Sequence, residues 1–117
     1  MGTNYYLVKN QPTIREPVHI GKSSAGWLFL FQNQYMPWLD DPIVWHTWPQ
    51  VRMRLEQLTK TDPRYVILNE YDEAVSFDDF VKLVEDKQKD PHCLGNPDNF
   101  HWVENVDGYR FTDGDFR

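Results

Sequence analysis

Short runs of apolar and aromatic residues alternate with polar segments along the first third of the chain. Residues 4–8 are rich in tyrosine and aliphatic side chains, a composition that favours a first β-strand. A polar connection containing Pro12 and Pro17 follows this run. Residues 18–22 and residues 26–31 then flank a short stretch of small residues, and this arrangement predicts a β-hairpin.

Two central segments repeat apolar residues at helical spacing, which predicts two amphipathic helices. The first is expected to run from about residue 48 to residue 59, with Thr47 and Gln50 resembling a capping box at its start. The second is expected to begin after Ser76, which has Asp79 three residues later. The predicted buried faces consist of Trp48, Val51, Leu55 and Leu58 in the first helix and Phe77, Phe80, Val81 and Val84 in the second.

Further short strands are predicted in the second half of the chain. Residues 65–69 form a β-branched and aromatic run that favours a fourth strand. Residues 100–103 and 109–111 are predicted as two more strands, with a turn at residues 107–108 before the last of them. The order of these elements predicts one α+β domain over residues 1–117. In this domain two helices pack on a mainly antiparallel sheet of about four to six short strands.

Acidic residues outnumber basic ones, so the formal net charge is −6 at pH 7. Non-specific binding to nucleic acid or to an anionic membrane depends on clustered lysine and arginine, which this charge opposes. Arg52, Arg54, Lys60 and Arg64 form a mild basic cluster, and a solvated helix face explains it equally well. The chain also has five tryptophans, six tyrosines and seven phenylalanines. A core of this size needs fewer, so we expect some rings to line a pocket or a partner surface.

Cys93 is the single cysteine of the sequence, which excludes an intrachain disulfide and fits a reducing compartment. The first residues lack the basic flank and apolar core of a signal peptide. The longest apolar runs are much shorter than a membrane span. We therefore expect a soluble protein of the cytoplasm that has no membrane partner.

The segment from residue 19 to residue 27 combines small residues, a lysine and an indole next to an apolar run. Glycines allow a close backbone approach or a positive φ, and the N–H groups of such a turn can converge on an anion. Lysine adds a charge and serine adds hydroxyl donors, a combination that suits a phosphate or a carboxylate. An ordinary β-turn explains the same residues, because glycine and serine dominate turns for conformational reasons. The candidate ligand-binding residues are His19, Gly21, Lys22, Ser23, Ser24, Gly26 and Trp27.

The Gly-Lys-Ser sequence at residues 21–23 does not make this segment a P-loop of the kind that hydrolyses nucleoside triphosphates. That motif needs a glycine five residues before Gly21, where this chain has Glu16. It also opens a helix, whereas the apolar run at residues 27–31 is typical of a strand. A nucleoside triphosphatase of the usual kind is therefore not expected.

His19 and Trp27 flank the predicted loop. Strand alternation is expected to place His19 on the same face as Gly21, where it can share the surface of the loop that begins at Lys22. A surface histidine bonded to a neighbouring carbonyl is the alternative. Trp27 directly follows Gly26, so its indole can stack on a base, although its alternation with the next aromatic residues also fits a core face.

Residue spacing reveals neither a metal site nor a catalytic site. The histidines and the cysteine do not form close ligand pairs such as Cys-x-x-Cys, so we expect no metal and no cofactor. His92 and Cys93 are adjacent, whereas an activated thiolate needs a base positioned separately. Asp113 and Asp115 flank a glycine, a sequence that is typical of turns. No residue is therefore assigned a catalytic role.

The opening Met-Gly-Thr-Asn-Tyr-Tyr and the nonapeptide His-Ile-Gly-Lys-Ser-Ser-Ala-Gly-Trp at residues 19–27 resemble a family of small tailed-bacteriophage proteins. The resemblance extends more weakly to residues 70–84 and to residues 108–116. Many members carry a Cys-x-x-Cys pair between the first strand and the nonapeptide, where a metal fits. This chain has no cysteine there, and a metal in that segment is not expected. The resemblance implies a phage origin and a host-cytoplasm setting, without a particular chemistry.

Together these patterns favour a small-ligand-binding protein that sequesters a nucleotide-derived host defence signal without turnover. In this hypothesis the loop N–H groups, Lys22 and the serines hold phosphate, and a homo-oligomer can bury the ligand between subunits. A protein-interaction inhibitor of a host factor is the alternative, supported by the charge balance and the surplus of aromatic residues. A third hypothesis, a small phosphohydrolase using His19 or His101 with an aspartate, lacks a recognisable catalytic arrangement.

Overall fold

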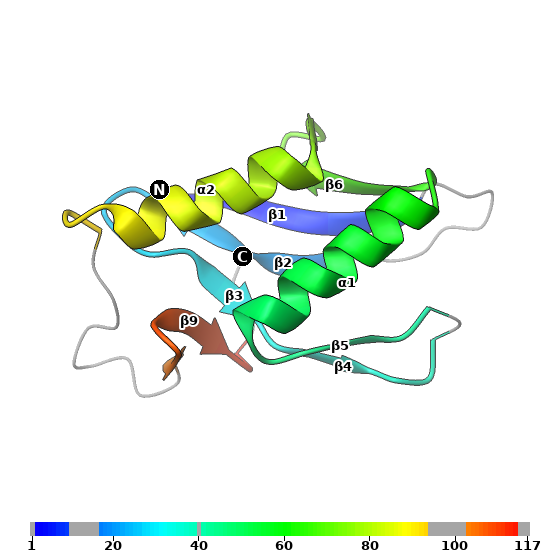
Figure 1. Cartoon of the computed structure of the whole chain (residues 1–117), viewed down its shortest axis with the longest axis horizontal. Coiled ribbons are helices and arrows are strands. Elements are labelled where there is room, and N and C mark those ends of the chain that lie inside the picture. Colours follow the sequence, from blue (N-terminus) through cyan, green and yellow to red (C-terminus); the bar gives the residue numbers. More distant parts are fainter. Residues whose placement is uncertain (1, 10–16, 40, 94–102, 115–117) are drawn as a thin grey trace.

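Nine strands and two helices follow one another in the part of the chain that the structure describes, which comprises residues 2–9, 17–39, 41–93 and 103–114 of a computed structural model (Figure 1). In chain order they are β1 (Gly2–Lys9), β2 (Val18–Ser24), β3 (Leu30–Gln32), β4 (Gln34–Met36), β5 (Ile43–Trp45), α1 (Trp48–Thr61), β6 (Tyr65–Asn69), β7 (Ala74–Val75), α2 (Phe77–Lys89), β8 (Val103–Val106) and β9 (Tyr109–Thr112).

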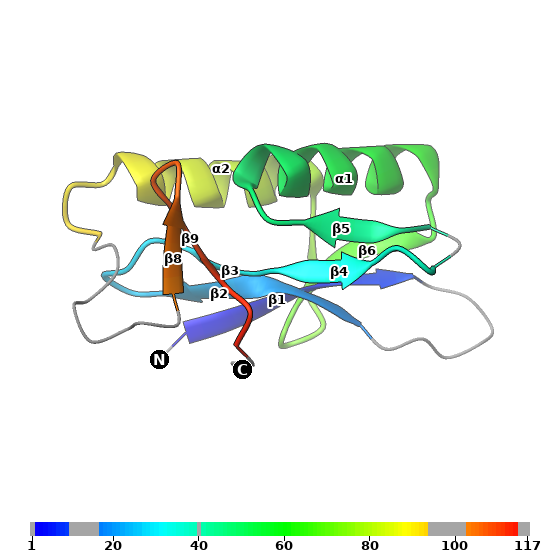
Figure 2. The ribbon, with the colours of Figure 1, turned by 90° about the horizontal axis from the view of Figure 1, so that it is seen from below.

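The described strands form a seven-stranded sheet in the order β7-β6-β1-β2-β3-β9-β8, and β4 and β5 form a separate two-stranded sheet. Neighbouring strands are antiparallel except β3 and β9, which run parallel. Both helices cover the same face of the large sheet, and the β4–β5 hairpin lies beside α1 (Figures 1 and 2). The predicted α+β class and mainly antiparallel sheet are confirmed, whereas the strands are more numerous than expected.

The core lies between the helices and the sheet face that they cover. Its centre is aromatic: Phe31 stacks on Phe111 with ring centroids 4.8 Å apart, and Phe29 meets Phe80 edge-on at 5.5 Å. Of the predicted helix faces, the fully buried members are Trp48, Val51, Leu55 and Leu58 in α1 and Phe80 and Val84 in α2. The other two predicted members, at residues 77 and 81, are half-buried because they line the groove between the helices.

Both helices begin at the predicted caps. The Thr47 side chain accepts a hydrogen bond from the N–H of Gln50, and the Ser76 side chain accepts one from the N–H of Asp79. Gln50 does not complete the predicted capping box, because its side-chain oxygen accepts from the backbone N–H of His46 instead. The first helix also continues to residue 61, past its expected end at residue 59.

Several strand predictions are confirmed and others are incomplete. The strand β6 has the predicted bounds, and a turn in which Asp107 and Gly108 both have positive φ joins β8 to β9. The strand predicted at residues 100–103 lies outside the described residues except for Val103, where β8 begins. The sequence did not predict β4, β5 and β7, because strands of two or three residues are too short to show alternation.

A β-bulge interrupts the pairing of β1 with β2. Tyr5 lies opposite Gly21 and the next residue, Tyr6, lies opposite His19, so Ile20 is an extra residue in β2. Directly opposed residues share a sheet face, whereas the successive residues Tyr5 and Tyr6 face opposite sides. His19 and Gly21 therefore lie on opposite faces, and the expectation that they share one is wrong. Alternation counted along a single strand does not hold across a bulge.

Candidate functional site

The predicted loop begins later than expected, because residues 22–24 belong to β2 and lie opposite the start of β1. A turn at residues 25–26 follows, and the N–H of Trp27 closes it by donating to the Ser24 carbonyl at 3.2 Å. The Lys87 ammonium, from the last turn of α2, donates to the carbonyls of Ser24 and Trp27 at 2.8 and 3.0 Å. Carbonyl oxygens therefore converge here on a cation, whereas the anion hypothesis expects converging N–H groups.

The two glycines of the predicted loop have different roles. A Cβ on Gly21 would lie 2.2 Å from the Leu30 carbonyl oxygen and 2.4 Å from the Phe29 ring, so the absent side chain lets β3 approach β2. Gly26 has a φ of +80°, and no atom lies within 4 Å of the position of a Cβ there. Gly21 thus permits a close contact in the core, and Gly26 permits the turn.

His19, Lys22 and Ser24 lie on the sheet face opposite the helices, because they pair with alternate residues of β1. The His19 side chain is 2% exposed, its Nε2 lies 2.9 Å from the side-chain oxygen of Asn4, and its ring packs 5.3 Å from that of Tyr6. The alternative of a surface histidine is therefore wrong. The structure brings these three predicted residues together on one face, while Ser23 lies on the other.

Trp27 is half-buried and has a cation on one side of its ring. The Arg110 guanidinium of β9 lies 5.3 Å from the indole centroid and donates to the Leu28 carbonyl at 3.0 Å. A contact at this distance occupies one indole face with protein. If Trp27 stacks on a base, the base must therefore contact the other face of the indole.

Lys22→Ala is expected to change the free energy of unfolding by less than about 0.5 kcal/mol, because Lys22 is half-buried near the end of β2, on the sheet face opposite the helices and outside the core. If the face around Lys22 holds an anion, the same change should weaken that complex by roughly ten- to a hundredfold, since a charge-assisted hydrogen bond is lost. Thermal unfolding and calorimetry of both proteins separate these effects. Unchanged stability with unchanged affinity would remove Lys22 from any binding role.

A hollow of about 370 Å³ lies at the opposite end of β2, between the large sheet and the β4–β5 hairpin. We call it the hairpin hollow. Its apolar walls combine two strands of the sheet with the hairpin and its connection. They are formed by Leu7, Val18, Met36, Leu39 and Ile43. Lys9, Asp41 and Tyr65 complete the lining and supply its charged and hydroxyl groups.

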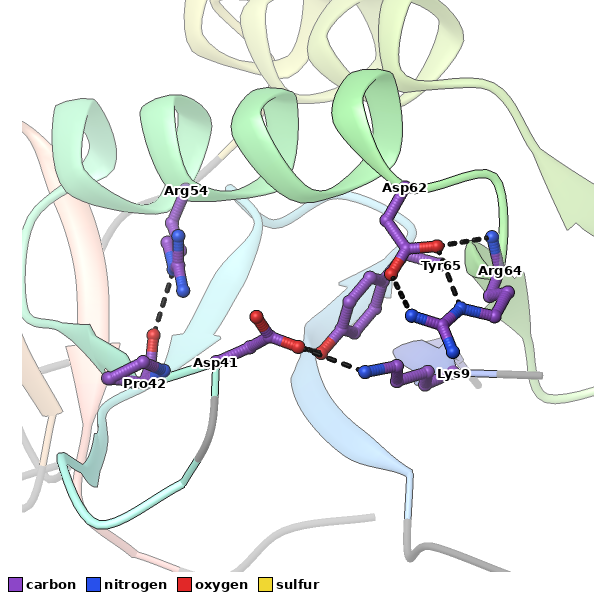
Figure 3. A network of polar contacts seen from close by, with 7 residues as sticks. All are labelled: Lys9, Asp41, Pro42, Arg54, Asp62, Arg64 and Tyr65. Carbon is purple, nitrogen blue, oxygen red and sulfur yellow. Dashed lines mark hydrogen bonds and ion pairs between the residues drawn. The ribbon is translucent and has the colours of Figure 1, made fainter. Parts of the chain in front are cut away.

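The three polar lining residues contact one another through a single carboxylate oxygen (Figure 3). Lys9 Nζ donates to Asp41 Oδ2 at 3.0 Å, and the Tyr65 hydroxyl donates to the same oxygen at 2.8 Å. The Lys9 ammonium also lies 5.1 Å from the centroid of the Tyr65 ring. The hydrogen bond from Lys9, followed by that from Tyr65, holds the pKa of Asp41 below its usual value, so this carboxylate is charged at neutral pH.

Further polar contacts surround this cluster on the side of α1 (Figure 3). Arg54 Nε donates to the carbonyl of Pro42 at 2.8 Å, which joins the helix to the hairpin connection. Arg64 donates to both carboxylate oxygens of Asp62 through its guanidinium, and this pair lowers the pKa of Asp62 to about 2. The hairpin is therefore fastened beside the hollow from two directions, by Lys9 and Tyr65 through Asp41 and by Arg54 through Pro42.

The sequence did not predict the hairpin hollow, because its lining residues come from five separate strands and the connection between β4 and β5. One feature of the sequence, the position of Lys9, could have indicated the hollow. Alternation places Lys9 on the same face of β1 as Leu7, which is an unusual position for a lysine beside an inward-facing leucine. The partner, Asp41, lies in the segment that was predicted only as a loop.

Other kinds of site find no support in the described residues. No group of three histidine, cysteine or acidic residues there is arranged to hold a metal ion. None of the described helices is long and apolar enough to cross a membrane. No family model, no curated protein and no solved structure matches this chain.

Proposed function

We propose that this protein binds a small, partly apolar ligand in the hairpin hollow and does not turn it over. The observation that carries this proposal is the combination of five apolar side chains with the nearly buried Lys9 ammonium around a space of about 370 Å³. Small-molecule sites in proteins are typically concave spaces of this order, mostly apolar and with a few placed polar groups.

Binding without chemistry is the simplest function for this lining. Asp41 is its only carboxylate among the described lining residues, and two donors already share one of its oxygens. A lowered pKa makes Asp41 a weak base at neutral pH, which does not favour a role in proton abstraction. The cluster is suited to orient a ligand and to hold the hairpin.

Val18→Phe is expected to weaken binding at least tenfold, a loss of about 1.4 kcal/mol, because the larger side chain fills part of the hollow. The measurement is calorimetry with a panel of medium-chain carboxylates, their primary amides, aromatic carboxylates, mononucleotides, dinucleotides and cyclic nucleotides, and ADP-ribose derivatives. Val44→Phe is the matched control, since Val44 belongs to β5 but does not line the hollow. The proposal fails if no compound binds the wild-type protein, or if both variants bind equally well.

The narrower form of the proposal is that a phage protein sequesters a nucleotide-derived host defence signal, with or without burial between subunits of a homo-oligomer. Lys22 and Ser24 on one sheet face favour a phosphate contact there. The same panel separates the two locations. A nucleotide whose affinity falls in Lys22→Ala and not in Val18→Phe binds at the β2 terminus, and the reverse pattern assigns it to the hairpin hollow.

A second candidate function, inhibition of a host protein by surface contact, is favoured by two aromatic side chains of the hairpin. Tyr35 is 65% exposed and Trp38 is 72% exposed, and both residue types are enriched in protein interfaces. In native mass spectrometry of protein from infected cells, a co-purified small molecule supports sequestration and a co-purified polypeptide lost in Trp38→Ser supports inhibition.

A further inference from the structure

The Lys9 ammonium has more donors than the described protein groups around it accept. Its side chain is 10% exposed and lines the hairpin hollow. A lysine ammonium carries three N–H donors. Among the contacts of the described residues it makes one hydrogen bond, to Asp41, and it lies over the ring of Tyr65. A nearly buried cation gains when a further acceptor occupies the adjoining space.

The surroundings of this ammonium are more cationic than the chain as a whole. Arg54 and Arg64 act on the Asp41 carboxylate through space, as Lys9 does by contact. The cluster in Figure 3 thus holds three cationic side chains, those of Lys9, Arg54 and Arg64. It holds two carboxylates, those of Asp41 and Asp62. The chain carries a formal charge of −6. An anionic head group therefore meets an excess of one positive charge here, against the overall field.

The apolar walls restrict the rest of the ligand. Leu7, Val18 and Ile43 offer no hydrogen-bond partner through their side chains, and Met36 and Leu39 add none of appreciable strength. A ligand rich in hydroxyl or amide groups would lose its bonds to water without replacement. A nucleotide carries such groups on both its sugar and its base. The lining is better suited to a hydrocarbon or aromatic body.

We infer that the hairpin hollow takes an amphipathic monoanion, in which an apolar body carries one carboxylate and this carboxylate binds Lys9 in competition with Asp41. This inference rests on the proposed function, because it names the ligand class of the same site. Asp41 comes from the hairpin connection and Lys9 from the large sheet, so the ligand head also competes for the contact that fastens the hairpin.

The test uses the full chain and straight-chain carboxylates from hexanoate to dodecanoate, each paired with its neutral primary amide and kept below its critical micelle concentration. Calorimetry is expected to show at least tenfold tighter binding of each carboxylate than of its amide. Affinity should rise about fourfold per added CH₂ until the hollow is filled. Equal affinities within a pair would overturn the inference and leave the proposed function standing. If neither the carboxylates nor the amides bind, both the inferred ligand class and the proposed binding of partly apolar ligands in the hairpin hollow are wrong.

Two substitutions locate the head group. Lys9→Met keeps an apolar stem without the charge, so it should abolish the carboxylate preference and change the amide affinity by less than about twofold. Asp41→Asn retains an oxygen that can accept from Tyr65 but removes the competing anion, so carboxylates should bind about tenfold tighter and amides equally well. Lys60→Met, on the exposed side of α1, is the control and should change neither series. A carboxylate preference that survives in Lys9→Met would contradict the assignment of the head group.

Discussion

Phe80→Ala is expected to lower the free energy of unfolding by about 3 to 5 kcal/mol. Phe80 is fully buried on α2. Its ring lies 5.7 Å from that of Tyr5, 5.5 Å from that of Phe29 and 6.4 Å from that of Trp48, measured between centroids. It thus joins both helices to the sheet. Removing the ring loses burial and leaves a cavity that rigid neighbours cannot fill.

The measurement is denaturant unfolding of wild-type protein and the variant, with Phe77→Ala as the control on the same helix. Phe77 is half-buried in the groove between the helices, so its loss should cost about 1 to 2 kcal/mol. A domain of ordinary stability survives the control and is close to unfolding with Phe80→Ala. Equal losses in the two variants would mean that the face of α2 that packs on the sheet is assigned wrongly.

Gly21→Ala is expected to destabilise the protein by about 3 kcal/mol or to prevent folding, which is the upper end of the cost of overpacking. The nearest atom to an added Cβ is the carbonyl oxygen of Leu30 at 2.2 Å. This is a backbone atom of β3, which pairs with β2 at this position, so it cannot move without breaking the sheet. The Phe29 ring at 2.4 Å closes the other side.

Gly26→Ala is the matched control, because it adds the same methyl group to the same predicted loop. Here the space is empty, and the cost is that of a positive φ in a residue with a Cβ, about 1 kcal/mol. Thermal and denaturant unfolding of the two variants should therefore differ clearly. If Gly26→Ala proves the more harmful change, then the turn, rather than the close approach of β3, is the reason for glycine in this segment.

The candidate site was predictable only in part. Small residues and a lysine at residues 21–26 correctly indicated a turn next to a buried strand, and Lys22 and Ser24 do share a face. The bulge at Ile20 and the Lys87 ammonium changed the rest. Because of the bulge, His19 and Gly21 lie on opposite faces of the sheet. The carbonyls of Ser24 and Trp27 accept hydrogen bonds from the Lys87 ammonium, so they contact a cation. Neither the bulge nor the Lys87 contact can be predicted from the sequence of residues 19–27 alone.

The sequence by itself determined the helices and strands that are stabilised by interactions between residues close in the chain. Helical periodicity and the caps at Thr47 and Ser76 placed both helices, and a β-branched run placed β6, because capping and alternation act between residues close in the chain. Only the tertiary structure decided the short hairpin of β4 and β5, the parallel pairing of β3 with β9, and the hairpin hollow. These depend on contacts between distant segments, such as Lys9 with Asp41, whose energy becomes available only when the whole sheet has formed.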